Sequence, residues 1–263
     1  MRFFNRHLLL LFAGAVLCLQ PLRTAAQDAN PVEHGKAVYD KYCYVCHGEK
    51  GDGKGLMGII HRAQKNGMVV YTYPRDFTGG MYKFRSTSSG YLPTDEDLMK
   101  TITNGIPRSG MPSHKDLTVE ERSAVIAFIK TYSKRWTEEK PGKLIMFGET
   151  PDYIGTKASI ERGRVLYIED MQCNKCHGDT GMGDGPSAEG LKDAWGDKIM
   201  PFDFTSGPLK GGTKPLDIYR TFVTGLDGTP MPSYEESLSG QRAWDLVSFC
   251  QQLMKGEKHV AEK

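Results

Sequence analysis

Cys43-Tyr44-Val45-Cys46-His47 and Cys173-Asn174-Lys175-Cys176-His177 are two copies of one pattern, in which two cysteines enclose two other residues and a histidine follows. The copies lie 130 positions apart in a chain of 263 residues. Further segments recur in the same order: Tyr73-Pro74-Arg75-Asp76-Phe77-Thr78 corresponds to Met200-Pro201-Phe202-Asp203-Phe204-Thr205, and Met111-Pro112-Ser113 corresponds to Met231-Pro232-Ser233. A repeated order of features predicts two copies of one domain.

The repeat also predicts the domain boundaries. We expect a first domain over residues 30–137 and a second over residues 158–256, with a frayed tail at 257–263. The linker at 138–157 contains two turn-forming pairs, Pro141-Gly142 and Pro151-Asp152, and little apolar periodicity.

Helix signals dominate each copy, and strand signals are scarce. Thr94-Asp95-Glu96-Asp97 and Thr118-Val119-Glu120-Glu121 are typical of helix starts, as is Pro215 in the second copy. The final helix of the second copy has an apolar stripe on which Cys250 is expected to be a small buried side chain. The predicted fold class is all-α, with two small, loop-rich domains, and such domains need a bound group or cross-link to complete the core.

The first 26 residues resemble a cleaved secretory signal. Arg2 and Arg6 give a basic start, His7 to Leu19 is almost entirely apolar, and Thr24-Ala25-Ala26 supplies small residues for cleavage near Ala26. Retention as an anchor is the alternative, although the apolar run is shorter than the roughly 20 residues that span a bilayer. We therefore expect a periplasmic protein without a transmembrane segment after cleavage.

The charge balance bears on partners. Removal of residues 1–26 takes away three arginines and no acid, which leaves 31 basic against 32 acidic residues. A nucleic-acid partner would call for a basic face, so the composition argues against one.

Cys-x-x-Cys-His is the attachment signal for haem c. Cys43 and Cys46, and Cys173 and Cys176, would bind one haem per copy through their sulfur atoms, with His47 and His177 as proximal iron ligands. A zinc site would require further thiol or imidazole ligands, and neither copy has a second cysteine pair. We therefore predict two covalent haem c groups.

The sixth iron ligand is a separate prediction. Haem iron in electron-transfer proteins is often held by His and Met, and the thioether raises the reduction potential. The candidate methionines are Met57, Met68, Met81, Met99 and Met111 in the first copy, and Met182, Met200 and Met231 in the second. Only Met111 and Met231 coincide in the repeat, each before a proline that fixes the backbone. We predict these two as ligands; filling of core space is the alternative role.

Other residues carry weaker signals. His61 and His114 have no counterpart in the second copy, so we expect solvated or hydrogen-bonded histidines. Asp76-Phe77 and Asp203-Phe204 do repeat, and the sequence leaves open whether they line the haem pockets or hold the long insertions at 59–91 and 188–213.

The order of helix, Cys-x-x-Cys-His, Gly-rich loop, middle helix, Met-Pro turn and final helix resembles class I cytochrome c, present twice. The pair is similar to di-haem cytochromes of the cytochrome c4 kind and to di-haem subunits of membrane-linked oxidoreductases. The resemblance implies a helix crossing of Gly35 and Tyr39 on Phe128, and of Gly163 and Tyr167 on Phe249. It also implies redox protein partners, such as a membrane-associated or molybdenum-type oxidoreductase.

These features leave three functions to compare. An electron carrier needs iron with both axial positions filled by protein, and a carrier subunit linking a catalytic partner to a respiratory chain needs the same chemistry. A di-haem enzyme, such as a peroxidase or a thiosulfate-oxidising cytochrome, needs an open iron position or a cysteine ligand. The paired His and Met favour a carrier over an enzyme.

Overall fold

Helices of the two repeats occur in the same order along the chain. The computed structural model describes residues 30–63 and 69–256, so the predicted signal segment 1–26 and the tail 257–263 lie outside the described residues. The helices of the first repeat are α1 (Pro31–Tyr42), α2 (Tyr44–His47), α3 (Asp95–Asn104), α4 (Val119–Lys130) and α5 (Arg135–Glu138). Those of the second are α6 (Lys157–Val165), η2 (Leu166–Asp170), α7 (Asn174–His177), η3 (Phe204–Ser206), α8 (Pro215–Thr224) and α9 (Gly240–Met254). The predicted all-α class is confirmed.

The helix starts follow from local chemistry. The side-chain oxygens of Thr94 and Thr118 accept from the backbone N–H three residues later, at Asp97 and Glu121. The carboxylates of Asp97 and Glu121 in turn accept from the backbone N–H of the capping threonine. Pro215 opens α8, where its missing N–H has no helical partner to lose.

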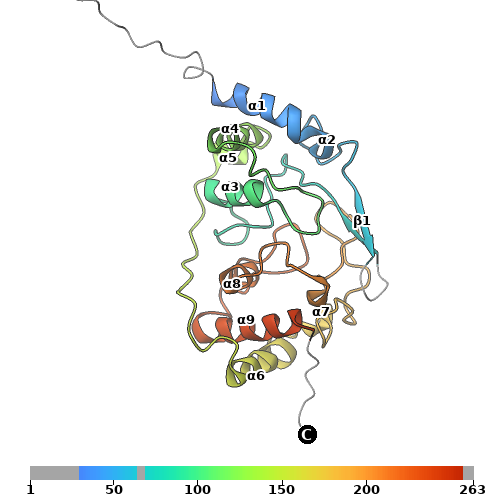
Figure 1. Cartoon of the computed structure of the whole chain (residues 1–263), viewed down its shortest axis with the longest axis vertical. Helices are drawn as coiled ribbons and strands as arrows, with labels where there is room; N and C mark the ends of the chain where they lie inside the picture. The colour runs from blue at the N-terminus through green and yellow to red at the C-terminus, as the bar shows by residue number, and fades with distance from the viewer. Residues whose placement is uncertain (1–29, 64–68, 257–263) are drawn as a thin grey trace, which may run out of the picture. The chain divides into compact units, whose positions relative to one another are not determined.

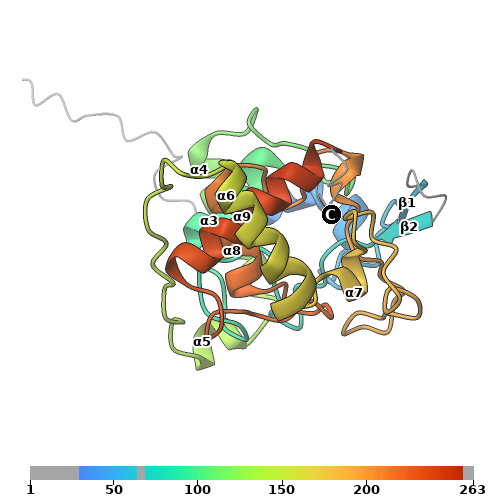
Figure 2. The same cartoon turned by 90° about the horizontal axis from the view of Figure 1, so that it is seen from below.

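The N-terminal and C-terminal helices of each repeat cross at a glycine. α1 packs on α4, and α6 packs on α9 (Figures 1 and 2). A Cβ added at Gly35 would lie 2.0 Å from the carbonyl oxygen of Ala124, and one at Gly163 would lie 2.0 Å from that of Asp245. Only glycine permits this approach, so the crossing implied by the resemblance is confirmed.

An aromatic pair completes each crossing. Tyr39 contacts Phe128 with ring centroids 5.2 Å apart, and Tyr167 contacts Phe249 at 5.1 Å. Each tyrosine hydroxyl donates to the carbonyl of the glycine that follows the histidine of the Cys-x-x-Cys-His segment, Gly48 at 2.7 Å and Gly178 at 2.8 Å. The crossing is therefore bonded directly to the Cys-x-x-Cys-His segment.

A π-helical turn accommodates two extra residues in the second repeat. The first cysteine follows the core tyrosine by four positions at Tyr39 and by six at Tyr167. The segment η2 and a positive φ of 53° at Gln172 take up the difference. The backbone N–H of Cys43 and of Cys173 still reaches the carbonyl of its tyrosine at 2.8 Å in both repeats.

The insertion in the first repeat contains a feature that the sequence did not predict. Strands β1 (Ile60–Ala63) and β2 (Val69–Thr72) form a two-stranded antiparallel sheet with Ile60 opposite Thr72. Short strands of four residues give little period-2 signal, which explains why they were missed.

The predicted linker has contacts with both repeats. Its extended part runs from α5 to α6 (Figure 1), and Leu144 forms an antiparallel bridge with Thr87. The backbone N–H of Ile145 donates to the carbonyl of Ser86 at 2.9 Å. Four of its side chains pack against the core of the second repeat: Ile145, Phe147, Tyr153 and Ile154. No helix in the described part of the chain combines the length and apolar character needed to cross a bilayer.

Candidate haem sites

The two histidines of the Cys-x-x-Cys-His segments are held in the same way. His47 ends α2, and its Nδ1 lies 3.0 Å from the carbonyl oxygen of Arg75; His177 ends α7, with Nδ1 3.2 Å from that of Phe202. A carbonyl accepts only, so Nδ1 carries the proton and donates, which leaves the Nε2 lone pair for a metal. Burial lowers the pKa of both histidines, which favours this neutral imidazole.

The repeated Asp-Phe pair positions these histidines. Phe77 stacks on His47 with ring centroids 4.6 Å apart, and Phe204 stacks on His177 at 4.9 Å. The aspartate before each phenylalanine closes the turn, because Oδ1 of Asp76 accepts from the backbone and hydroxyl of Thr78. Asp203 accepts from Thr205 in the same way. Of the two roles left open by the sequence, lining of the haem pocket is supported for Phe77, which lines the first cavity beside His47.

The four cysteines form no disulfide with one another and lie in the first turn of these segments. Cys43 and Cys46 line one cavity together with His47. Burial raises the pKa of Cys43 to about 12 and that of Cys173 to about 11, so their immediate surroundings are apolar.

The cavity of the first repeat is mainly apolar and has cations at one part of its lining. Its cationic side chains are Arg75, Lys83 and Lys210, the last from the second repeat, and no Asp or Glu is among the described residues that line it. Burial, with repulsion from Arg75 and Lys210, lowers the pKa of Lys83 to about 7. Burial also lowers the pKa of Arg75, to about 10. An apolar ring bearing two carboxylates supplies the negative charge that this lining lacks, so a haem fits the residues present.

The two Met-Pro turns are matched bond for bond. The carbonyl of Met111 accepts from Ile106 N–H at 3.1 Å, and that of Met231 accepts from Leu226 N–H at 3.2 Å. The N–H of each methionine donates to a hydroxyl two residues earlier, that of Ser109 or Thr229. The backbone of Met111 and that of Met231 are therefore held by the same set of hydrogen bonds.

The neighbours of the turns also correspond. Ser113 Oγ donates to the carbonyl of Thr103 at 2.8 Å, and Ser233 Oγ donates to that of Val223 at 2.6 Å. These bonds join each turn to the end of the middle helix, α3 or α8.

The structure separates the candidate methionines. Met111 lines the cavity that contains His47, and Met231 packs against the second core together with Cys173 and Phe204. Met57 also lines the first cavity, but it is 67% exposed and its N–H bonds to the carbonyl of Val45, beside the cysteines. Met68 lies outside the described residues.

The two unmatched histidines differ. His61 contacts Tyr71 across the sheet with ring centroids 4.7 Å apart. His114 lines the first cavity and occupies the position of Tyr234, since the N–H of each bonds to the corresponding helix carbonyl, that of Ile102 or Phe222. His114 is therefore a second imidazole in the lining of the first cavity, and its expected role as a solvated or hydrogen-bonded histidine stays a prediction.

Contacts between the repeats involve Arg75 and Phe202, whose carbonyls accept from His47 and His177. The guanidinium of Arg75 lies 4.4 Å from the ring centroid of Trp195, whose Nε1–H donates to Asp76 at 3.1 Å. The guanidinium of Arg108 lies 5.3 Å from the ring of Phe202 and donates to the carbonyl of Ser206. Arg75 and Phe202, whose carbonyls accept from His47 and His177, thus both contact the other repeat.

Cys250 behaves as predicted. It lies in α9, is buried in the core of the second repeat, and burial raises the pKa of its thiol. Among the described residues, no three His, Cys, Asp or Glu side chains gather in the way that a protein-bound metal ion would require.

The fold and the two matched sites define a c-type cytochrome. Residues 32–133 match the family model for cytochrome c, and residues 158–249 match the model for subunit III of cbb3-type cytochrome c oxidase. A chain of the Kuenenia stuttgartiensis reducing HAO-like protein complex is 43% identical, with 85% of this chain and 96% of that chain covered and a TM-score of 0.77. The protein belongs to the di-haem class I cytochromes c and carries two covalently bound haem c groups.

The remaining comparisons add less. Kuenenia stuttgartiensis hydrazine synthase, in crystals pressurised with xenon, matches at 15% identity over 94% of this chain and 99% of that chain, with a TM-score of only 0.28. No curated protein matches the sequence.

Proposed function

We propose that this protein is an exported electron carrier that passes single electrons between redox proteins through two saturated haem sites. The observation that supports this most is the identical support of His47 and His177 and of Met111 and Met231. Fixed protein ligands on both sides of the iron suit electron transfer, because little rearrangement accompanies a change of oxidation state.

In this proposal each side chain has one role. Cys43 and Cys46 bind the first haem through thioether bonds, and Cys173 and Cys176 bind the second. Nε2 of His47 and of His177 is the proximal ligand, and the sulfur of Met111 and of Met231 is the distal ligand. The haem supplies an iron that alternates between the ferrous and ferric states.

The surrounding residues set the conditions for that chemistry. The bonds from Nδ1 to the carbonyls of Arg75 and Phe202 keep both imidazoles neutral and in one orientation. The apolar lining excludes water, and the cations Arg75, Lys83 and Lys210 raise the cost of placing further positive charge in the first site.

A subunit role follows from the relative of 43% identity. That chain is a component of a reducing HAO-like protein complex. We propose that this protein likewise passes electrons to or from a larger oxidoreductase and is not itself the catalyst. Co-purification of the tagged protein from its native host, under low-salt and high-salt washes, tests for such a stable partner.

Carbon monoxide binding distinguishes a carrier from an enzyme. A carrier with saturated iron should leave its ferrous spectrum unchanged under carbon monoxide at neutral pH. Rapid formation of a carbonyl complex at either haem, together with turnover of hydrogen peroxide, would favour the enzyme alternative.

Export is tested by mass. The proposal predicts that the mature protein begins near residue 27, carries the added mass of two haems and is released with the periplasmic fraction. A mass that retains residues 1–26, with the protein in the membrane fraction, would indicate an anchored form instead.

A further inference from the structure

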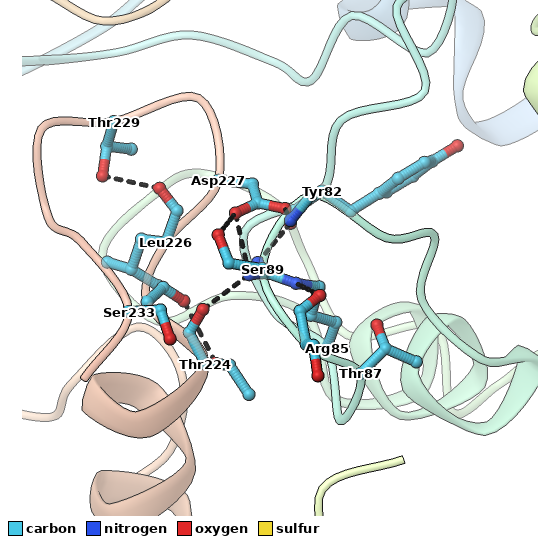
Figure 3. Close-up of polar contacts among 12 residues, drawn as sticks. Tyr82, Arg85, Thr87, Ser89, Thr224, Leu226, Asp227, Thr229 and Ser233 are labelled. Atoms are coloured by element: carbon cyan, nitrogen blue, oxygen red, sulfur yellow. Dashed lines mark hydrogen bonds and ion pairs between the residues drawn. The ribbon is translucent and has the colours of Figure 1, made fainter. Parts of the chain in front are cut away.

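A fully buried arginine of the first repeat reaches the second repeat. Arg85 is 0% exposed, and its guanidinium forms an ion pair with Asp227, with Nη2 2.7 Å from Oδ1. Nη2 also donates to the carbonyl of Thr224 at 2.5 Å. Figure 3 shows the arginine between its own loop and the end of α8.

The first repeat supplies further donors to the same carboxylate. Ser89 Oγ donates to Asp227 Oδ1 at 2.8 Å, and the backbone N–H of Gly90 donates to Oδ2 at 2.9 Å. Arg85 is itself fixed within its loop, because it donates to the carbonyls of Tyr82 and Ser88 at 3.3 Å. Both carboxylate oxygens of Asp227 thus accept hydrogen bonds from one short loop of the first repeat (Figure 3).

Thr224 and Asp227, which Arg85 contacts, lie directly before the Met231 turn and within it. Thr224 ends α8, so its carbonyl has no helical partner and accepts from Arg85 instead. Asp227 follows Leu226, whose N–H pairs with the carbonyl of Met231 at 3.2 Å and whose carbonyl accepts from Thr229 Oγ1 at 2.7 Å. Displacement of Asp227 would therefore move Leu226, whose backbone bond to Met231 fixes the position of the methionine.

The arrangement has no equivalent at the other turn. The position matching Asp227, 120 residues earlier, is Pro107, which has no carboxylate and no N–H. The Met111 turn has the same internal hydrogen bonds but lacks this ion pair, and it contacts the second repeat through Arg108, which donates to the carbonyl of Ser206.

We infer that Arg85 of the first domain is a positioning residue for the Met231 ligand of the second haem, acting through Asp227 and Thr224. The inference rests on the proposed axial role of Met231. It assigns to this domain contact a role in ligation: loss of the contacts of Arg85 with Asp227 and Thr224 would loosen the ligand of the second haem.

The test uses the long-wavelength Fe–S(Met) charge-transfer band of the ferric holoprotein. Met111→Ala removes the contribution of the first haem, so the remaining band reports Met231 alone. In that background Arg85→Ala should lose at least half of the remaining band. Arg85→Lys keeps the positive charge but cannot donate to several acceptors in fixed directions as a guanidinium does, so it should lose less of the band. In the wild-type background Arg85→Ala should keep the contribution of the first haem.

A matched control separates ligation from general destabilisation. Arg162, whose side chain is 46% exposed, pairs with the buried Asp245 of the second repeat at 2.7 Å, and the pair joins α6 to α9 and not to the Met231 turn. Arg162→Ala should therefore lower thermal stability without changing the band. If Arg85→Ala does not fold, Asp227→Asn provides the same comparison, because it removes the charge while keeping the side-chain volume.

The outcomes are distinct. Absence of any band in Met111→Ala would overturn the proposed ligation by Met231. A band in Met111→Ala that persists at full strength with Arg85→Ala or Asp227→Asn would overturn the positioning inference and leave the ligation intact. A band lost equally with Arg162→Ala would also overturn it, because the effect would then be one of stability.

Discussion

Nδ1 of His47 lies 3.0 Å from the carbonyl oxygen of Arg75, and the guanidinium of the same arginine stacks on Trp195 of the second repeat. One residue therefore orients the imidazole of the first site through its backbone and contacts the other domain through its side chain. The corresponding residue, Phe202, orients His177 and accepts the guanidinium of Arg108 on its ring. Arg75 and Phe202 thus each accept a hydrogen bond from a histidine and also take part in the contact between the repeats.

Phe77 should be needed for the order of the His47 ring. Phe77→Ala removes the ring that stacks on the imidazole at 4.6 Å, and the buried cavity should cost about 3–5 kcal/mol of unfolding free energy. We also expect broader ferric electron paramagnetic resonance lines from the first haem, because its imidazole can rotate. Phe204→Ala is the matched variant and should broaden the second haem instead; unchanged lines in both variants would show that stacking does not hold the rings.

The glycine at each helix crossing should not tolerate a side chain. Gly35→Ala places a Cβ where the carbonyl oxygen of Ala124 lies 2.0 Å away, so the helices must separate, at a cost of about 3 kcal/mol. Denaturant unfolding of the holoprotein measures this loss. Gly79→Ala is the control, since its Cβ would meet only Met81 at 3.7 Å, and equal stability of the two variants would contradict the packing account.

Lys83 should raise the potential of the first haem. Lys83 has a pKa of about 7, so it carries a positive charge in the cavity lining below that pH. Measured there, Lys83→Gln removes the charge, favours the ferric form and should lower the potential by tens of millivolts, the order expected for a unit charge in a partly polar pocket. Lys115→Gln changes an exposed lysine and should have little effect. A potential that stays constant or rises in Lys83→Gln would rule out this electrostatic role.

Much of the fold was predictable because its signals are local. The helix starts at Thr94 and Thr118 depend on neighbours three residues away, and the resemblance to class I cytochrome c implied the crossings at Gly35 and Gly163. The same repeat singled out Met111 and Met231 from the other methionines. Period and spacing carry this information directly.

The features that were missed depend on partners distant in sequence. The stacking of Phe77 on His47 joins residues 30 positions apart, and the ion pair of Arg85 with Asp227 joins residues 142 apart. Neither residue type signals such a partner by itself. The place of His114 in the first cavity was not predicted for a related reason, since its counterpart Tyr234 is a different residue type and the repeat gave no signal for it.

The most direct test of the account is a potentiometric titration with spectra, made on the wild-type protein and on Met111→Ala and Met231→Ala. We predict two haems per chain, each with an Fe–S(Met) band, and the loss of one contribution in each variant. The potential of the affected haem should fall by on the order of 0.1 V, a fraction of the range of about 0.8 V that axial ligands span. Full retention of the band and of both potentials in the two variants would contradict saturation of both irons by His and Met.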